Sequence, residues 1–135
     1  MSNTMMTPGM SGSSEVTVSE EMLASSVGSG KVAVFSTAMM VAGMEGTAVD
    51  VVQGSLEDGQ TTVGTALNIT HVSATPQGMK VRFTAELTAV SANGKGLSFK
   101  VAAHDEAGLI GEGTHERVVV NQKKFEDRTR AKKRD

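Results

Sequence analysis

The stretch that most constrains the fold of this chain is residues 37–52, TAMMVAGMEGTAVDVV, which is apolar nearly all round. It is long enough for a helix of about four turns, and a helix that is apolar on every side is normally buried. Gly43 and Gly46 each cost roughly 1 kcal/mol of helix propensity relative to Ala, so we expect close backbone packing to offset them. The rest of the chain must therefore wrap around this helix.

Residues 79–90 show the pattern of a long strand with one buried face and one wet face. The apolar positions are Met79, Val81, Phe83, Ala85, Leu87 and Ala89, and the polar positions between them are Lys80, Arg82, Thr84, Glu86 and Thr88. Asn93-Gly94 follows, the commonest pair in tight hairpins. The alternation then resumes over residues 97–104, which predicts a second strand antiparallel to the first.

Two further strands are predicted at residues 61–72, rich in Thr, Val and Ile, and at residues 110–121. Ahead of the central helix, residues 15–18 favour a short strand, and Ser19 is suited to cap a helical turn that runs to about Val27. An antiparallel sheet of this length would curl around a single apolar helix to cover it. We therefore predict an α+β chain with a long antiparallel sheet wrapped around one central helix, which is the hotdog fold.

At 135 residues the chain has room for one domain. We predict a disordered leader over residues 1–14, which lack any period, the domain over residues 15–121, and a charged tail over residues 122–135. The tail carries seven basic and three acidic side chains, against six basic and twelve acidic in the rest. We interpret it as a solvated segment. The alternative is that it attracts the phosphates of an anionic ligand.

The composition excludes several classes of function. Without cysteine there is no disulfide, thiol nucleophile or zinc–thiolate site, and the three histidines show no metal-ligand spacing. Four Phe, no Trp or Tyr and a net charge of -2 argue against nucleic-acid binding. No apolar run approaches the roughly 20 residues of a membrane helix, and the start of the chain lacks a signal peptide. We expect a cytoplasmic protein without metal or cofactor.

Three blocks in order carry a family resemblance: VFSTAMMVAGMEG, VGTALNITHVSATPQGMKV and GEGTHERVVV. They closely resemble the hotdog thioesterases typified by fluoroacetyl-CoA thioesterase, over residues 16–125. The resemblance implies three catalytic groups, Thr37 at the start of the central helix, Glu45 eight residues on, and His71 late in the next strand. It also implies that the thioester lies close to the backbone of Gly64.

The resemblance further implies an acyl-CoA ligand, and we expect Arg117 of the closing Thr-His-Glu-Arg, with the basic tail, to contact the CoA phosphates. The fluoroacetate-specific member has a longer, aromatic-rich lid ahead of the helix. Here that segment is short, and Phe35 is its only aromatic residue. We therefore expect a short- or medium-chain acyl group other than fluoroacetyl.

Glu45 is also the most informative residue on physical grounds. It lies among Val41, Ala42, Ala48 and Val49 at helical spacing, where an unpaired carboxylate is costly. A carboxylate kept there suits a general base or a nucleophile. The alternative is a structural Glu bonded to backbone across a subunit interface.

Thr37 and His71 have structural alternatives too. Thr37 could simply cap the helix, and a lone strand His that shares a face with Leu67 and Ile69 could simply be part of the core. As a catalytic group, His71 would stabilise charge on the reacting acyl group. Eight residues of helix span roughly 12 Å, so Thr37 and Glu45 cannot touch in one straight helix. Either the helix starts after Thr37, or one site takes groups from two subunits.

The sequence thus predicts a thioesterase that hydrolyses a short- or medium-chain acyl-CoA with water and no cofactor, as a homodimer or a dimer of dimers. The alternative is a hotdog module that binds acyl-CoA without turnover.

Overall fold

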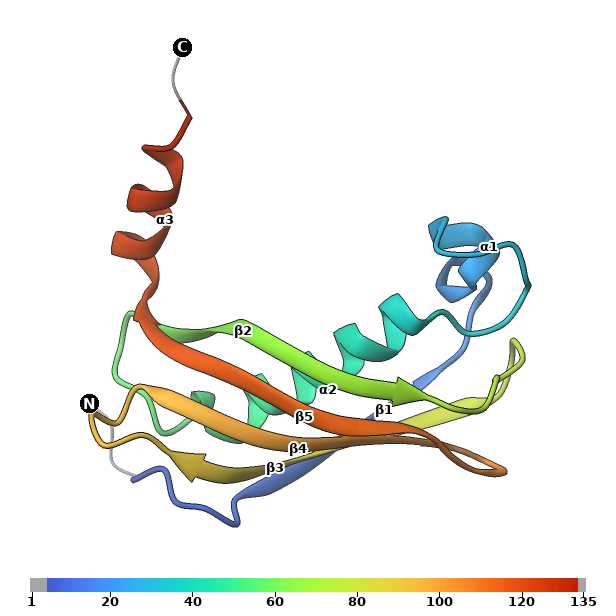
Figure 1. The fold of residues 1–135 in the computed structure, drawn as a ribbon, viewed down its shortest axis with the longest axis horizontal. Coiled ribbons are helices and arrows are strands. Elements are labelled where there is room, and N and C mark those ends of the chain that lie inside the picture. Colours follow the sequence, from blue (N-terminus) through green and yellow to red (C-terminus); the bar gives the residue numbers. More distant parts are fainter. Residues whose placement is uncertain (1–4, 134–135) are drawn as a thin grey trace.

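The computed structural model describes residues 5–133, which form one long antiparallel sheet around one helix (Figure 1). The sheet order is β1-β3-β4-β5-β2, and every neighbouring pair is antiparallel. The elements are β1 (Ser11–Thr17), the 3-10 turn η1 (Glu20–Met22), α1 (Ala24–Val27), α2 (Thr37–Gln53), β2 (Gln60–His71), β3 (Lys80–Val90), β4 (Gly96–Asp105), β5 (Gly108–Asn121) and α3 (Gln122–Arg130). The predicted α+β arrangement is confirmed.

The core lies between the inner face of the sheet and one face of α2. Alternate residues of β3 and β4 are buried over most of their length, as the sequence pattern predicts: Val81, Phe83, Ala85, Leu87, Leu97, Phe99, Val101 and Ala103. The expectation was wrong for Ala89, which is exposed, because the register of β3 with β4 shifts between Leu87 and Ala89. The helix meets them with residues spaced four apart: Met40, Met44, Ala48 and Val52, none of which is exposed. The alternation of apolar and polar residues in the strands therefore determines the face of the sheet against which α2 packs.

The opposite face of α2 is not covered within one chain. Ala38, Ala42, Gly46 and Asp50, also spaced four apart, are exposed. The expectation that the helix is buried all round is therefore wrong for the single chain, because the sheet reaches only one side of it. Small residues on the open side would allow another surface to approach closely.

Gly43 is the helix position where backbone packing is tightest. A Cβ atom at this position would lie 2.3 Å from the Phe83 ring, whereas nothing lies within 4 Å of one at Gly46. Close packing thus offsets the glycine cost at Gly43 but not at Gly46. We expect Gly43→Ala to destabilise the fold by about 1–3 kcal/mol, because the helix must move off the sheet. Urea denaturation measures this, and an unchanged midpoint would show that Phe83 gives way freely.

The N-terminal strand is longer than predicted. We expected disorder up to residue 14, but β1 begins at Ser11 and pairs with β3 from Ser11↔Glu86 to Thr17↔Lys80. Residues 11–14 of this strand were missed because they meet the helix without apolar side chains. A Cβ atom at Gly12 would lie 3.2 Å from Val51, and the Ser14 hydroxyl lies 2.6 Å from the Thr47 hydroxyl. The first part of the expected leader, residues 1–4, lies outside the described residues.

The helical segment predicted from Ser19 to Val27 is interrupted. Ser19 makes no side-chain capping bond, and Leu23, between η1 and α1, is extended with φ -77° and ψ 149°. Leu23 is buried and forms an isolated antiparallel bridge with Phe35. Burial of this one leucine against the core therefore overrides the local preference for a continuous helix.

The charged tail begins as the helix α3, which follows directly from the end of β5 at Asn121. The Asn121 side chain caps it by accepting a hydrogen bond from the Lys124 amide at 3.0 Å. All of its residues are exposed. It projects from the end of the molecule opposite α1 (Figure 1). None of the described helices has the length and apolar character needed to cross a membrane.

Candidate active site

Thr37 and His71 form a hydrogen-bonded pair at one end of the sheet. The Thr37 hydroxyl lies 2.7 Å from His71 Nδ1, which joins the start of α2 to the end of β2. Ser36, not Thr37, caps the helix, because its hydroxyl accepts a hydrogen bond from the Met39 amide at 3.1 Å. The capping role is therefore already filled, and the Thr37 hydroxyl is left for other bonds.

The surroundings of the His71 imidazole favour its neutral form. Burial lowers its pKa, and the nearby Ser73 backbone offsets part of this effect. Its Nε2 atom is buried and has no hydrogen-bond partner among the described residues. Since an unpartnered buried nitrogen costs about 1–3 kcal/mol, this atom is a candidate for contact with a ligand or a second subunit.

The pair lines a hollow of about 330 Å³ between the loop before α2 and the end of β2. Its other lining residues are small or apolar: Ala24, Ser29, Val34, Phe35, Ser36, Val72, Ser73 and Ala74. A hollow with two polar groups at one point and a mostly apolar wall suits a small, uncharged chain.

Glu45 lies at the middle of α2 beside Arg117 of β5. Arg117 is only 7% exposed, and its NH1 donates to Glu45 Oε2 at 3.3 Å. Its other nitrogens donate to the Thr62 hydroxyl at 2.8 Å and the Thr62 carbonyl at 2.9 Å. Burial lowers the pKa of Arg117, while the Glu45 charge opposes that shift. The guanidinium therefore fixes one carboxylate oxygen in space.

His115 completes this cluster as a neutral ring. Its Nδ1 lies 2.8 Å from the Ala66 carbonyl, so Nδ1 must donate. Its Nε2 lies 3.1 Å from Arg117 NH1, so Nε2 must accept. The 3.9 Å separation between Nε2 and Glu45 Oε2 is therefore no ion pair, because the Nε2 lone pair is already engaged.

A bulge in β2 brings Gly64 onto the same face as this cluster. The register with β5 shifts between Gly64 and Ala66, so that Gly64 pairs with Arg117 and His71 with Gly111. Gly64 and His71 are an odd number of residues apart and would otherwise lie on opposite faces. A Cβ atom at Gly64 would lie 2.7 Å from Glu45 Oε2. The Glu45 carboxylate therefore occupies the space that a side chain at position 64 would otherwise fill.

The three predicted catalytic residues divide into two groups within one chain. Thr37 pairs with His71, and Glu45 lies with Arg117 and Gly64. Helix α2 runs without a break from Thr37 to Gln53, so roughly 12 Å of helix separates Thr37 from Glu45. Of the two explanations left open by the sequence, a later helix start is thus wrong.

Arg117 was expected to contact the CoA phosphates, but in this structure it is buried and donates to Thr62, His115 and Glu45 instead. His115, for which the sequence predicted no role, is 1% exposed and accepts a hydrogen bond from Arg117. His115 and Arg117 precede buried Val119 at every second position of β5, and this period of two in the sequence indicated that both side chains point inward.

His104 is exposed on the outer face of β4. Within residues 5–133, no three His, Asp or Glu side chains gather closely enough to hold a metal ion.

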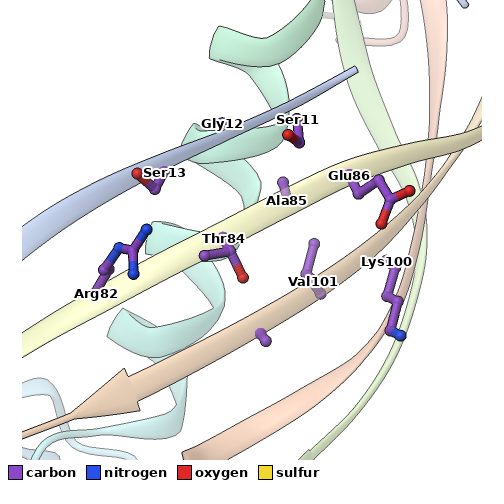
Figure 2. Close-up of a pocket in the computed structure, with 10 residues that line it drawn as sticks. Ser11, Gly12, Ser13, Arg82, Thr84, Ala85, Glu86, Lys100 and Val101 are labelled. Carbon is purple, nitrogen blue, oxygen red and sulfur yellow. The ribbon is translucent and has the colours of Figure 1, made fainter. Parts of the chain in front are cut away.

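A hollow of about 360 Å³ on the outer face of the sheet, over β1, β3 and β4, contains none of the predicted site residues (Figure 2). Lys100 is the cross-strand neighbour of Glu86, whereas Arg82 lies four residues from Glu86 along β3 (Figure 2). The mixed charges give it no clear ligand preference.

We expect Gly64→Ala to lower activity without unfolding the protein. The new Cβ atom would displace the Glu45 carboxylate, the mobile end of a side chain, and a displacement near 1 Å can cost about 10²-fold in rate. Gly54→Ala is the control, because nothing lies within 4 Å of a Cβ atom at Gly54. Full activity in the Gly64 variant would show that the carboxylate position is unimportant.

Comparison with known proteins identifies the family. A family profile described as fluoroacetyl-CoA-specific thioesterase matches residues 18–123. The fluoroacetyl-CoA thioesterase of Streptantibioticus cattleyicolor is 46% identical over 99 residues, which cover 73% of this chain and 70% of that protein. The chain belongs to the fluoroacetyl-CoA-specific thioesterase family.

Solved structures agree with this membership. A structure of the fluoroacetyl-CoA thioesterase is 35% identical, covers 96% of this chain and 98% of its own, and gives a TM-score of 0.89. A variant of that enzyme in complex with fluoroacetate and CoA is 36% identical, with a TM-score of 0.83 over 89% of this chain and 99% of that one. A thioesterase superfamily member from Thermus thermophilus is 29% identical, with a TM-score of 0.83 over 93% of this chain and 91% of that one. This family member therefore has the predicted hotdog fold.

Proposed function

We propose that this protein hydrolyses the thioester of a short- or medium-chain acyl-CoA to the free acid and CoA. The observation that carries the proposal is the Glu45 carboxylate, which buried Arg117 holds above the bare backbone of Gly64. A glycine there leaves room for a thioester beside the carboxylate. The 41% exposure of the Glu45 side chain in one chain keeps it open to a substrate and to water.

The active unit that we propose is a homodimer built on β2, and a dimer of dimers would repeat this unit. β2 stands at the edge of the sheet, with β5 as its neighbour on one side. An open edge of this length is a ready template for another strand. A two-fold axis would pair β2 with its copy antiparallel.

This pairing supports a composite site. Antiparallel copies of β2 place the start of one strand beside the end of the other. His71 of the partner subunit, with its Thr37 contact, would then approach the half of β2 that holds Gly64. Each site would combine Thr37 and His71 from one subunit with Glu45, Gly64 and Arg117 from the other.

In the reaction that we propose, water adds to the thioester carbonyl and the carbon–sulfur bond breaks. Glu45 takes a proton from the water and returns it to the departing thiolate. Thr37 and His71 bind the carbonyl oxygen on which negative charge develops. A direct attack by Glu45 would instead form a mixed anhydride with loss of the CoA thiolate. A single turnover in heavy-oxygen water would then leave label in the Glu45 carboxylate when water attacks the glutamyl carbonyl of that anhydride.

The short or medium length of the acyl group rests on the hollow beside Thr37 and His71. At about 330 Å³ with mostly small lining residues, it accommodates a short chain rather than a long one. Release of CoA from a panel of acyl-CoAs of increasing length tests this. Highest kcat/KM for a long-chain substrate would contradict it.

The alternative, a module that binds acyl-CoA without turnover, predicts tight binding and no release of CoA in the same panel. A carboxylate oriented by a buried guanidinium favours the enzyme. The cytoplasm remains the predicted compartment, since a chain without cysteine gains nothing from an oxidising one.

Mixing two inactive variants tests the composite site. Glu45→Gln and His71→Ala homodimers each lack one group in both sites, whereas a mixed dimer would hold one intact site. Random exchange of subunits should therefore restore about a quarter of wild-type activity. No recovery after demonstrated exchange would show that each site is built from one chain.

A further inference from the structure

A groove of about 340 Å³ lies where the end of β5 meets α3 and the β3–β4 hairpin. Its charged lining residues are Lys95, Lys124 and Arg128, and no carboxylate lines it. None of the three cations forms an ion pair with a described residue. The chain as a whole has a net charge of -2, so this groove is a local concentration of positive charge. Such a concentration favours an anionic ligand.

The two faces of α3 differ. Lys123 and Arg130 both pair with Asp127, so one carboxylate offsets part of their positive charge within the helix. Lys124 and Arg128, one turn apart, face the groove instead. The positive charges of α3 that have no ion-pair partner among the described residues therefore lie along the groove.

Phe125 lines the same groove with 37% of its surface exposed. The other three Phe residues, Phe35, Phe83 and Phe99, are each 1% exposed. An exposed aromatic ring among cations is the combination that stacks on a planar base while binding its phosphates.

We propose that this groove binds the nucleotide end of CoA, with Lys95, Lys124 and Arg128 on the phosphates and Phe125 against the adenine. This inference rests on the proposed function and deepens it. It also replaces the expected phosphate contact of Arg117, which is buried elsewhere.

The position of the groove fits this role. Gln60 lines it and lies four residues before Gly64 on β2, about 13 Å along the strand. The extended pantetheine arm of CoA would bridge that gap. Within one chain, α3 and α1 lie at opposite ends of the molecule (Figure 1). The antiparallel dimer brings α3 beside the Thr37–His71 end of the partner.

The test compares an acyl-CoA with the same acyl group on pantetheine, which lacks the nucleotide. For Lys124→Gln/Arg128→Gln, we expect KM for acyl-CoA to rise about ten-fold or more, because charge-assisted bonds to phosphate are lost. We expect kcat, and KM for acyl-pantetheine, to stay near wild type. Phe125→Leu should also raise KM for acyl-CoA alone.

Lys123→Gln/Arg130→Gln is the matched control, since it removes the same charge from the other face of α3. An equal rise in KM for both double variants would overturn the site in favour of long-range charge. The proposed nucleotide site would also be overturned if Lys124→Gln/Arg128→Gln raised KM only for acyl groups attached to a carrier protein and not for acyl-CoA. Calorimetric binding of CoA itself provides a second readout, in which the groove variant should bind about ten-fold more weakly. If wild type binds CoA but hydrolyses neither substrate, the proposed function fails while the groove is still tested.

Discussion

Glu45→Gln is expected to lower kcat for acyl-CoA hydrolysis by about 10²–10⁴-fold, the range for loss of a general base. The amide keeps the size of the side chain and can still accept from Arg117 NH1, but it cannot take a proton from water. The fold should persist, because 41% of the Glu45 side chain is exposed and water can solvate the amide. Steady-state release of CoA, together with a thermal melt, measures both effects.

Asp50→Asn is the matched control for this change. Asp50 lies on the same helix and is exposed, and its carboxylate makes no ion pair with a described residue. Its variant should retain wild-type kcat. If Glu45→Gln kept more than about a third of wild-type kcat, the carboxylate would have no role in proton transfer.

Arg117→Met is expected to cost about 2–4 kcal/mol of unfolding free energy and most of the activity. Methionine fills much of the volume, but it leaves the Thr62 carbonyl and His115 Nε2 without their donors. Each buried acceptor left unpaired costs about 1–3 kcal/mol. Loss of the ion pair with Glu45 adds little to the loss of unfolding free energy, because water can solvate the exposed part of the Glu45 carboxylate. Urea denaturation gives the free energy.

A purely structural role for Arg117 would leave the folded enzyme fully active. We therefore expect kcat to fall at a temperature where the variant is fully folded, while the affinity for CoA stays unchanged. Lys at this position should restore part of kcat, because it keeps the charge but cannot make all four contacts. Arg82→Met, on the exposed outer face of β3, should change stability by no more than about 0.5 kcal/mol. Unchanged kcat in folded Arg117→Met would assign the residue to the core alone.

The periodic parts of the fold were predictable because each pattern is local. The alternation over residues 79–90 and 97–104 predicted the buried side chains of β3 and β4 except at Ala89, where a register shift follows Leu87. The apolar run at 37–52 predicted the bounds of α2 to within one residue. The first four residues of β1 and the break at Leu23 were missed, because both depend on contacts with distant residues. The family resemblance indicated Thr37, His71 and Gly64, and for Glu45 the position of a carboxylate on an apolar helix gave a second, independent indication.

The sequence by itself therefore determined the elements, the inner face of β3 and β4, and the residue types suited to thioester chemistry. Only the tertiary structure decided how those residues are grouped. The bulge after Gly64 sets the phase of β2, and the register of β2 with β5 brings Thr62 and Arg117 together. Pairing between strands separated by more than forty residues follows from the packing of the whole sheet around α2, and no local pattern of residues encodes it.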